Sequence, residues 1–415
     1  MLKYALTKLL IFFPVVFLIA IAVFFVSEIA PGDKIDAYMD IFGSNANENP
    51  ALKKADYIMT AKKLKLDKPE FYFSIRPYKI PDNYNSIILP ENKKIVDSLI
   101  ASNIDKTEIE KLLKFNIESE KYDLKNIITQ YKFNKKSGFL SNLPVFRFNG
   151  TDNRFHNWFK NIIKMDFGIS YVDGRNVSSK LSEALPYTII YVLMAYLFSL
   201  LISLPIALYS QLKENSISSR IINISLTLFY AMPLFWLATM AVIFLTSDEV
   251  FTITNIFPAI GIGNIFTNMT LTEKIKTAIP HLLLPALILA IHSGAYLSIL
   301  ISRSLKKEMG NPYFKGIITK GITKKSAIVK HAFPNSLIPL ITAIVVSLPG
   351  SIAGSVVIEV IFNIPGMGRL LYNSILKMDW NVVFAIVMIV GVMTYIFYII
   401  GDLIYYRLNA RMKLN

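Results

Sequence analysis

Near the N-terminus, residues 9–29 read LLIFFPVVFLIAIAVFFVSEI. A helix needs about 20 mostly apolar residues to cross the roughly 30 Å hydrocarbon core of a bilayer, and this stretch has that length without Lys, Arg or His. Five further apolar stretches of similar length follow, from Leu185 to Tyr209, Ile221 to Thr246, Ile279 to Ile301, Leu337 to Ile361 and Val383 to Ile404. The sequence therefore predicts an all-α polytopic membrane protein with six transmembrane helices.

The composition of the whole chain agrees with this class. Of 415 residues, 53% are hydrophobic and only 18% are charged, whereas about 25% of the residues of a soluble domain are charged. The mean hydropathy is +0.45. The chain contains no cysteine, which excludes thiolate catalysis, zinc–thiolate sites, iron–sulfur clusters and disulfides.

The first apolar stretch has one alternative interpretation. Ala20-Ile21-Ala22 has the small-x-small pattern of a signal-peptide cleavage site. The apolar run continues past this site through Val26, however, beyond the point where the core of a signal peptide ends. We therefore expect residues 1–30 to remain as the first transmembrane helix.

The distribution of Lys and Arg over the short loops predicts the orientation of the chain, because such loops are rich in these residues on the cytoplasmic side. The loops on one side contain only two acidic residues, Glu214 and Glu308, beside many basic ones: Lys3, Lys8, Lys213, Arg220, Arg303, Lys306, Lys307, Lys315, Lys320, Lys324, Lys325, Lys330, Arg407, Arg411 and Lys413. Basic and acidic residues balance on the other side. Both termini are therefore expected in the cytoplasm, and the net charge of +15 needs no nucleic-acid partner to explain it.

Residues 31–184 are expected to form a mixed extracytoplasmic domain between the first and second spans. Asp105 and Glu108 have the spacing of a capping box, and an apolar stripe at helical spacing follows, made of Ile109, Leu112, Leu113 and Ile117. A second amphipathic stretch, 51–66, precedes a Lys68-Pro69 stop. We find no metal-ligand cluster and no Ser/His/Asp arrangement here, and His156 is the only histidine of the segment.

The cytoplasmic segment 302–336 is expected to contain two short helices joined at a glycine. Asn311-Pro312 can start the first helix, and Gly321 can supply its left-handed stop. Thr323 can cap the second helix, which Pro334 would close. Apolar stripes are predicted on both helices, made of Phe314, Ile317 and Ile318 on the first and of Ala327, Ile328, His331 and Ala332 on the second. Such a segment could lie on the anionic leaflet, form a solvated loop or dock on another protein. Two apolar faces exceed what contact with a leaflet needs, so docking is favoured.

Several motifs resemble those of ABC-importer permeases. In the order of the chain they are APGD (30–33), KLDKP (65–69), DFGIS with DGR (166–170 and 173–175), LPYT (185–188), MPLFWL (232–237), PYFKGIITKG with HAFPNSLIP (312–321 and 331–339), and EVIFNIPGMGRL (359–370). The set is similar to the first permease subunit of dipeptide, oligopeptide and nickel importers. The resemblance covers nearly the whole chain except about residues 71–153, an insertion between the first two spans.

The resemblance implies a type I permease of the cytoplasmic (inner) membrane, with residues 185–415 as a five-helix core. It implies that the ATPase is contacted through Pro312, Tyr313, Phe314, Lys315, Ile318, Lys320, Gly321, His331 and Asn335. It implies an outer gate and pathway at Gly350, Gly354, Glu359, Phe362, Pro365, Gly366 and Gly368, with Glu359 making a gate-stabilising hydrogen bond. Asp402, like Glu359, is an acidic residue near the end of a span and a functional candidate by default.

The implied partners are two ABC ATPase subunits, a second permease chain that can be different or identical, an extracytoplasmic solute-binding protein and the lipid bilayer. No catalytic residue, metal site or cofactor is expected on this chain. ATP and Mg²⁺ would be used by the partner subunits, because the phosphate-binding motif GxxxxGK[ST] does not occur in this sequence. Peptide is the first choice of substrate on resemblance alone.

The coupling motif departs from the family pattern at one point. The family usually has an acidic residue and two alanines six to four positions before its glycine, whereas this chain has Lys315, Gly316 and Ile317 there. The polar contact with the ATPase would therefore have changed sign.

Two other function classes are weighed. An ion-coupled secondary transporter would be expected to have ionisable or unwound sites at mid-membrane, whereas here the ionisable groups lie near the ends of the spans. An intramembrane enzyme would need a catalytic constellation, and His292-Ser293-Gly294 is no more than a chance match.

Overall fold

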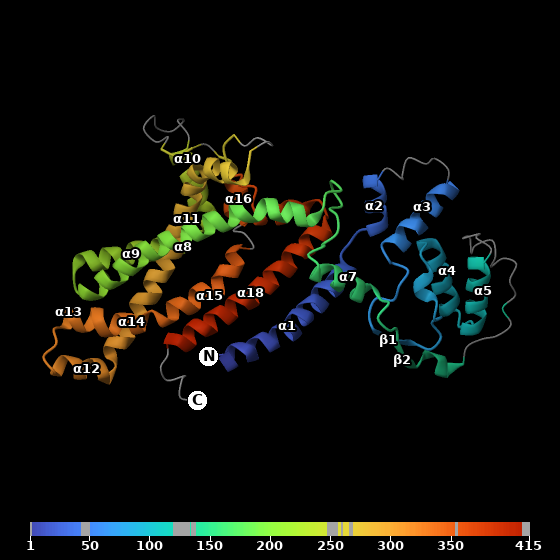
Figure 1. Cartoon of the computed structure of the whole chain (residues 1–415), viewed down its shortest axis with the longest axis horizontal. Coiled ribbons are helices and arrows are strands. Elements are labelled where there is room, and N and C mark those ends of the chain that lie inside the picture. Colours follow the sequence, from blue (N-terminus) through green and yellow to red (C-terminus); the bar gives the residue numbers. More distant parts are fainter. Residues whose placement is uncertain are drawn as a thin grey trace. The chain divides into compact units, whose positions relative to one another are not determined.

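The computed structural model describes residues 2–42, 50–118, 133, 138–246, 256–258, 260–264, 269–352 and 356–408. The chain divides into two compact units (Figure 1). We call residues 1–23 and 177–415 the membrane unit, and residues 24–176 the insertion unit. The first helix, α1 (Leu2–Ile29), contributes residues to both.

Five helices of the described residues are long and apolar enough to cross a membrane, and one bent helix pair makes a sixth candidate. The six candidates follow the order of the predicted spans. They are α1, α8 (Val177–Leu212), the pair α9 (Ile217–Ala231) and α10 (Leu234–Leu245), α11 (Leu271–Gly310), the consecutive helical turns Lys324–Ser351 that include most of α15 (Ile338–Ile352), and α18 (Trp380–Leu408). The predicted all-α class with six spans is confirmed when the bent pair is counted as one span.

The third predicted span, Ile221 to Thr246, is not a single straight helix. The helices α9 and α10 meet at a bend of 99°. Met232 at the bend is extended, with ψ 131°, because the ring of a following proline disfavours the helical conformation. Pro233 is then the N-cap of α10. A count of apolar residues alone cannot separate a straight span from this bent one.

The helices α8 and α11 pack along one another and are longer than their predicted spans. They contain 36 and 40 residues, which corresponds to about 54 and 60 Å of helix. A Cβ added to Gly294 of α11 would lie 3.5 Å from the backbone of Ser199 in α8, so the two backbones approach closely. Because a bilayer is only about 40–45 Å thick, both helices are long enough to project beyond it.

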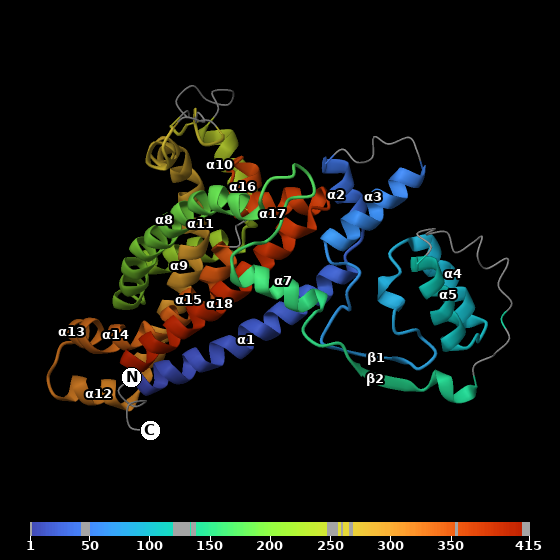
Figure 2. The same ribbon diagram turned by 45° about the vertical axis from the view of Figure 1, so that its right-hand side comes forward.

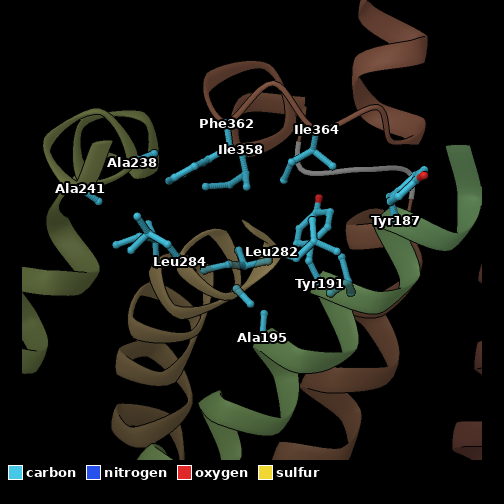
Figure 3. Close-up of a cluster of buried hydrophobic side chains, with 14 of the residues drawn as sticks. Tyr187, Tyr191, Ala195, Ala238, Ala241, Leu282, Leu284, Ile358, Phe362 and Ile364 are labelled. Atoms are coloured by element: carbon cyan, nitrogen blue, oxygen red, sulfur yellow. The ribbon is translucent and has the colours of Figure 1, made fainter. Parts of the chain in front are cut away.

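The largest apolar core of the membrane unit lies where α8, α10, α11 and α16 (Val356–Ile361) meet (Figure 3). Tyr191, Leu282, Ile358 and Ile364 are among its fully buried side chains. Figure 3 shows Tyr191 of α8 beneath the segment that carries Ile358, Phe362 and Ile364. This core therefore fixes the segment after α15 against the first half of α8.

A chain of short helices leads from α11 to α15. It consists of α12 (Pro312–Thr319), α13 (Lys324–Ala327), a π-helical turn η4 (Ile328–Ala332) and α14 (Phe333–Ser336). The expectation that Pro334 ends the second short helix is wrong, because α14 contains it and leads on to α15. The N–H of Phe333 bonds the carbonyl of Ile328, five residues back. This widened turn leaves room for a proline that can neither donate to the ladder nor fit a regular α-helix.

The C-terminal part of the membrane unit contains α16, α17 (Met367–Leu376) and α18. The helices α15 and α18 pack closely, since a Cβ added to Gly401 would lie 2.6 Å from Val345. Lys8 of α1 forms an ion pair with Asp402 of α18 at 2.6 Å. Asp402, which the sequence made a functional candidate, thus binds a cation of its own chain.

Among its described residues, the insertion unit contains short helices and one strand pair (Figure 2). After the end of α1 its elements are α2 (Lys34–Phe42), α3 (Pro50–Lys63), β1 (Phe73–Pro77), the 3-10 turn η2 (Tyr84–Ser86), α4 (Pro90–Ala101), α5 (Lys106–Glu118), the 3-10 turn η3 (Phe139–Asn142), β2 (Pro144–Phe148) and α7 (Arg154–Ile163). The strands β1 and β2 form an antiparallel ribbon in which Phe73 pairs with Phe148 and Ile75 with Phe146.

A small core holds α4 against α5. It contains Ile109, Leu112 and Leu113, the residues predicted to form an apolar stripe, packed with Val96 and Leu99. The predicted stripe is confirmed at these three positions, and the side chain of Ile117 lies outside the described ones. At the start of α5 the carboxylate of Asp105 accepts from the N–H of Thr107 at 3.0 Å, one residue earlier than the expected capping box places its bond.

Candidate functional site

A fully buried carboxylate joins three helices of the membrane unit. Glu359 of α16 has no exposed surface. Its carboxylate accepts hydrogen bonds from the hydroxyl of Thr188 at 2.7 Å and the hydroxyl of Tyr191 at 3.0 Å, both on α8. It also accepts from the backbone N–H of Arg369, in the first turn of α17, at 2.8 Å.

The same cluster satisfies a second amide at the start of α17. The hydroxyl of Thr188, while donating to Glu359, accepts from the backbone N–H of Met367 at 2.8 Å. The first N–H groups of a helix have no partner within the helix, and a carboxylate near them is favoured by the helix dipole. We call Thr188, Tyr191, Glu359 and the amides of Met367 and Arg369 the Glu359 cluster. It provides a cap for α17 built from α8 and α16.

The turn between α16 and α17 fits closely around this cluster. Asn363 adopts a left-handed conformation, φ 55°, and the N–H of Ile364 bonds the carbonyl of Glu359 at 2.8 Å. A Cβ added to Gly366 would lie 2.5 Å from Cδ and Oε2 of Glu359 and from the hydroxyl oxygen of Thr188. Of the predicted gate residues, Glu359, Phe362, Gly366 and Gly368 are buried here, and Pro365 is half-buried.

A segment before α11 also contacts this turn. The N–H of Gly261 donates to the carbonyl of Phe362 at 2.9 Å. The structure thus brings together three parts of the chain that are distant in sequence: α8, the 260–264 segment, and α16 with the α17 that follows it.

The segment 302–336, predicted to be cytoplasmic, has its own apolar core. Phe314, Ala327, Ile328 and Ala332 are buried against Leu305 of α11, and Leu208 and Leu212 from the end of α8 pack on them. The two predicted apolar stripes therefore pack mainly on each other and on the ends of α8 and α11, but the prediction is wrong for Ile318 and His331, which are exposed. Because the apolar side chains of this core are already buried within the chain, they do not by themselves require a docking partner.

The outward surface of this segment is mixed in character. Ile318, predicted to share the buried face of Phe314, is 36% exposed, and Ile322 and Val329 are 37% and 39% exposed. Among the predicted coupling residues Phe314 is buried, whereas the remaining ones are exposed like Ile318: Pro312, Tyr313, Lys315, Lys320, Gly321, His331 and Asn335. We call the surface formed by these residues with Ile318, Ile322 and Val329 the coupling surface.

The local conformations of the coupling segment follow its sequence. Gly321 has φ +83°, the left-handed stop that was predicted, and the hydroxyl of Thr323 accepts from the N–H of Ser326 at 3.4 Å. Asn311 is the N-cap of α12 by its backbone, since its carbonyl accepts from the N–H of Phe314.

Tyr313 links the start of α12 to its neighbours. Its hydroxyl donates to Glu308 at 2.7 Å and accepts from the amide of Asn335 at 3.3 Å. Burial, together with the bond to Glu308, raises the pKa of the Tyr313 phenol.

An exposed polar strip runs along α15. Gly350 is exposed, and a Cβ added there would meet no atom within 4 Å, so packing within this chain does not require a glycine. The hydroxyl of Tyr196 on α8 lies 2.8 Å from the hydroxyl of Ser347 and 3.2 Å from that of Ser351. Gly354, also predicted for the pathway, lies outside the described residues.

Sequence reasoning missed Tyr191, Tyr196 and Ser347, and quoted Thr188 only as part of a motif. Nothing in the local sequence marks the two tyrosines of α8, because their partners lie more than 150 residues away.

The comparisons with known proteins agree on one family. The model of the family described as "Binding-protein-dependent transport system inner membrane component" matches residues 199–414, just over half of the chain. The chain belongs to this family. It is a permease subunit of an ABC transporter and a multi-pass membrane protein, and the family is a transport component rather than an enzyme. Membership favours the ATP-driven interpretation over an ion-coupled transporter.

Two curated relatives illustrate the family. The oligopeptide transport system permease protein AppB of Bacillus subtilis (strain 168) is 28% identical over 257 residues, which cover 62% of this permease and 78% of AppB. The putrescine export system permease protein SapB of Escherichia coli (strain K12) is 25% identical over 259 residues, 60% of this permease and 81% of SapB. A solved structure of inward-facing MetNI methionine ABC transporter covers 55% of this permease and 96% of that chain, at 16% identity and a TM-score of 0.42.

Proposed function

We propose that this permease is one of two membrane chains of an ATP-driven peptide importer, and that it transmits motion between the coupling surface and the Glu359 cluster. One observation carries the proposal: α8 contacts both places. Thr188 belongs to the Glu359 cluster and Leu208 packs on the coupling segment. Twenty residues of helix separate them, about 30 Å, which is the thickness of the hydrocarbon core of a bilayer.

The proposed topology places the coupling surface in the cytoplasm. Figure 1 shows α12 to α14 near one end of α11, with α10 and α16 near its other end. The loops at the coupling end carry the excess of Lys and Arg that marks the cytoplasmic side. Both termini would then be cytoplasmic, and the insertion unit and the Glu359 cluster would face outward.

The coupling surface would receive the mechanical input. Two ATPase subunits, which use ATP and Mg²⁺, would bind its exposed apolar residues and its lysines. The apolar core around Phe314 joins this surface to α8 and α11, so a push on the segment is passed to both helices as one body. Lys315 stands where the family usually has an acidic residue, so we expect a matching acidic groove on the ATPase.

The Glu359 cluster would hold the outer side closed. It ties α17 to α8 through bonds that a shift of α8 relative to α17 would break. Because a buried donor without a partner costs about 1–3 kcal/mol, the bonded arrangement would be favoured until a bound solute or the ATPases offset that cost.

The solute would pass along the hydroxyls of Tyr196, Ser347 and Ser351, beside Gly350. Ser347 is exposed and Tyr196 and Ser351 are half-buried, and hydroxyls at the surface of a membrane helix suit a water-filled path or a second permease better than lipid. Peptide is our choice of substrate, because AppB is named for oligopeptides and the quoted motifs resemble peptide permeases. A second permease, identical or different, and an extracytoplasmic binding protein would complete the system, with residues 71–153 as part of the binding-protein dock.

The test is uptake by cells that contain the complete system. We expect accumulation of a labelled oligopeptide to stop when ATP is depleted and to persist when the ion gradients are collapsed. The opposite dependence would overturn the proposal. Putrescine and Ni²⁺ are added as competing solutes. Inhibition of peptide uptake by one of them and not by the other would reassign the substrate to the solute that inhibits.

A further inference from the structure

The ribbon β1–β2 presents an unusually apolar face. Phe73 and Ile75 of β1 lie on the same face as their cross-strand partners Phe148 and Phe146. These four side chains are 45%, 66%, 75% and 62% exposed, in that order. An aromatic side chain covers about 200 Å², so together they expose about 500 Å², in the upper part of the range of about 300–600 Å² for the largest patch on a typical soluble monomer.

The opposite face of the ribbon is polar and bonded to the insertion unit. Arg76 donates to the side chain of Asn85 at 2.9 Å, and Arg147 donates to the carbonyl of Ile80 at 2.8 Å and pairs with Asp82 at 2.8 Å. The ribbon is thus amphipathic, and its polar face is the one held by the rest of the unit. The apolar face, which we call the ribbon patch (Phe73, Ile75, Phe146 and Phe148), faces outward.

A series of ring contacts connects the ribbon patch to the end of α1. Phe25 of α1 lies 5.5 Å from Phe71, Phe71 lies 5.3 Å from Phe73, and Phe73 stacks on Phe146 at 5.6 Å. All of these residues belong to the insertion unit. The contacts are therefore internal to one compact body.

The helix α7 also holds the insertion unit against the last two turns of α1. Phe24 contacts Phe155 at 5.3 Å and Trp158 at 5.7 Å, and Arg154 forms an ion pair with Glu28. The N–H of Phe155 also bonds the carbonyl of Glu70, directly before the aromatic run that leads into β1. The ribbon cannot move away from the end of α1 without breaking these contacts.

The depth of these ring contacts in the membrane follows from the position of the first span. Residues 10–29 of α1 are the candidate membrane span, so Phe24 and Phe25 lie within its last two turns. Phe25 is about 6 Å below the end of that span, and the polar layer of a bilayer adds roughly 5–7 Å beyond the hydrocarbon. Rings bound at this level lie near the boundary between headgroups and hydrocarbon, where interfacial elements bury apolar side chains such as Phe and Leu.

We infer that the ribbon patch lies in the lipid headgroup layer, where it anchors the insertion unit flat against the membrane. Lys160 of α7 and Lys164, the C-cap of that helix, are both exposed and can bind anionic headgroups. The inference rests on the membrane insertion of α1 and is independent of the transported solute. A lipid surface is favoured over a protein partner because the ring series continues directly from a membrane-spanning helix.

The absence of cysteine from the sequence permits a direct test with single spin labels. Ile75→Cys and Phe148→Cys place a nitroxide in the ribbon patch. Ser74→Cys, on the other face of β1, and Ser98→Cys, exposed on α4, are the controls. The full-length permease is reconstituted in nanodiscs of phosphatidylcholine and phosphatidylglycerol, and labelled variants that do not elute as the native protein does are replaced by Phe73→Cys.

We expect the labels at 75 and 148 to be relaxed more by oxygen than by a water-soluble nickel chelate, with the reverse order at 74 and 98. Stronger relaxation by the nickel chelate at 75 and 148 would mean that the patch faces water, and would overturn the inference. Protection of these labels from both reagents would mean that a protein covers the patch, and would overturn it equally. Uptake measurements test the proposed function separately, since a patch in water leaves them unaffected.

Discussion

Gly366 is the position at which the addition of a single methyl group should destabilise the folded permease most. A Cβ there would lie 2.5 Å from Glu359 and from the hydroxyl oxygen of Thr188. Ends of side chains can usually move aside, but these two are held by hydrogen bonds of 2.7 and 2.8 Å within the Glu359 cluster. Gly366→Ala must therefore break bonds to make room.

The size of the effect follows from the donors that would lose their acceptor. Displacing Glu359 and Thr188 leaves two or three buried donors unpaired, at about 1–3 kcal/mol each. We expect Gly366→Ala to cost about 3–5 kcal/mol. The matched control is Gly350→Ala, at a helical position where the new Cβ meets no atom within 4 Å. That change should be neutral or stabilise by up to about 1 kcal/mol.

The assay is the fraction of purified permease in detergent that remains monodisperse after heating. Gly366→Ala should lose this property at a clearly lower temperature than the native chain, and Gly350→Ala should not. Adding Glu359→Ala to Gly366→Ala should cost less than the sum of the two single effects, because the two changes disturb the same contacts. Equal stability of Gly366→Ala and the native protein would refute the geometry proposed for this cluster.

Three further predictions concern the coupling segment, its neighbourhood and the insertion. Gly321→Val should strain a left-handed turn by about 1–2 kcal/mol. It should reduce the amount of ATPase subunit that is recovered with the permease, while membrane insertion of the permease stays intact. The control is Gly316→Ala, which lies in an exposed helical position with open space around it. The bond from Lys306 lowers the pKa of Glu214, so their 2.7 Å ion pair should stabilise the contact between the turn after α8 and the C-terminal end of α11 at pH values above the ordinary Glu pKa of about 4.3. It should lose that effect as the pH falls through the lowered value. Since Lys306 is mostly exposed, the loss should stay below about 1 kcal/mol, and Glu214→Gln should remove this part of the pH dependence of thermal stability. Deletion of residues 71–153 should weaken binding-protein affinity and uptake, and unchanged values of both would exclude a docking role for the insertion.

The spans and the local turns could be predicted because their signals lie within a few residues. Length and apolarity were enough for α1, α8, α11 and α18. Gly321 was recognisable because only a glycine readily adopts φ +83° at the end of a helix. The stripe on α5 followed from helical spacing alone.

The features that were missed depend on distant or subtle effects. Prediction of the bend at Met232-Pro233 requires the conformational restriction of the residue before a proline, which a count of apolar residues ignores. The continuation through Pro334 needed a π-helical turn that no local pattern announces. The partners of Glu359 on α8 are 171 and 168 residues away, so the sequence could indicate a buried acid but not the hydroxyls that bind it.

The stripes of the coupling segment show a third limit. Periodicity correctly identified apolar faces around Phe314 and Ile328, but it could not reveal what would cover them. The ends of α8 and α11 extend far enough to do so, because both helices are longer than their apolar cores. Docking on a partner therefore depends on the exposed coupling surface and not on those buried faces.

The most direct test of the central claim is site-specific crosslinking from the coupling surface. Ile318→Cys, the only cysteine in the chain, is given a short photoreactive label, and the permease is purified with its partner subunits from membranes. Ser98→Cys, exposed in the insertion unit, is the control. We predict that the label at 318 captures a nucleotide-hydrolysing subunit, with a yield that changes when ATP is bound, and that the label at 98 does not. Capture of lipid alone from position 318, in every nucleotide state, would contradict the claim that this surface couples the permease to ATP hydrolysis.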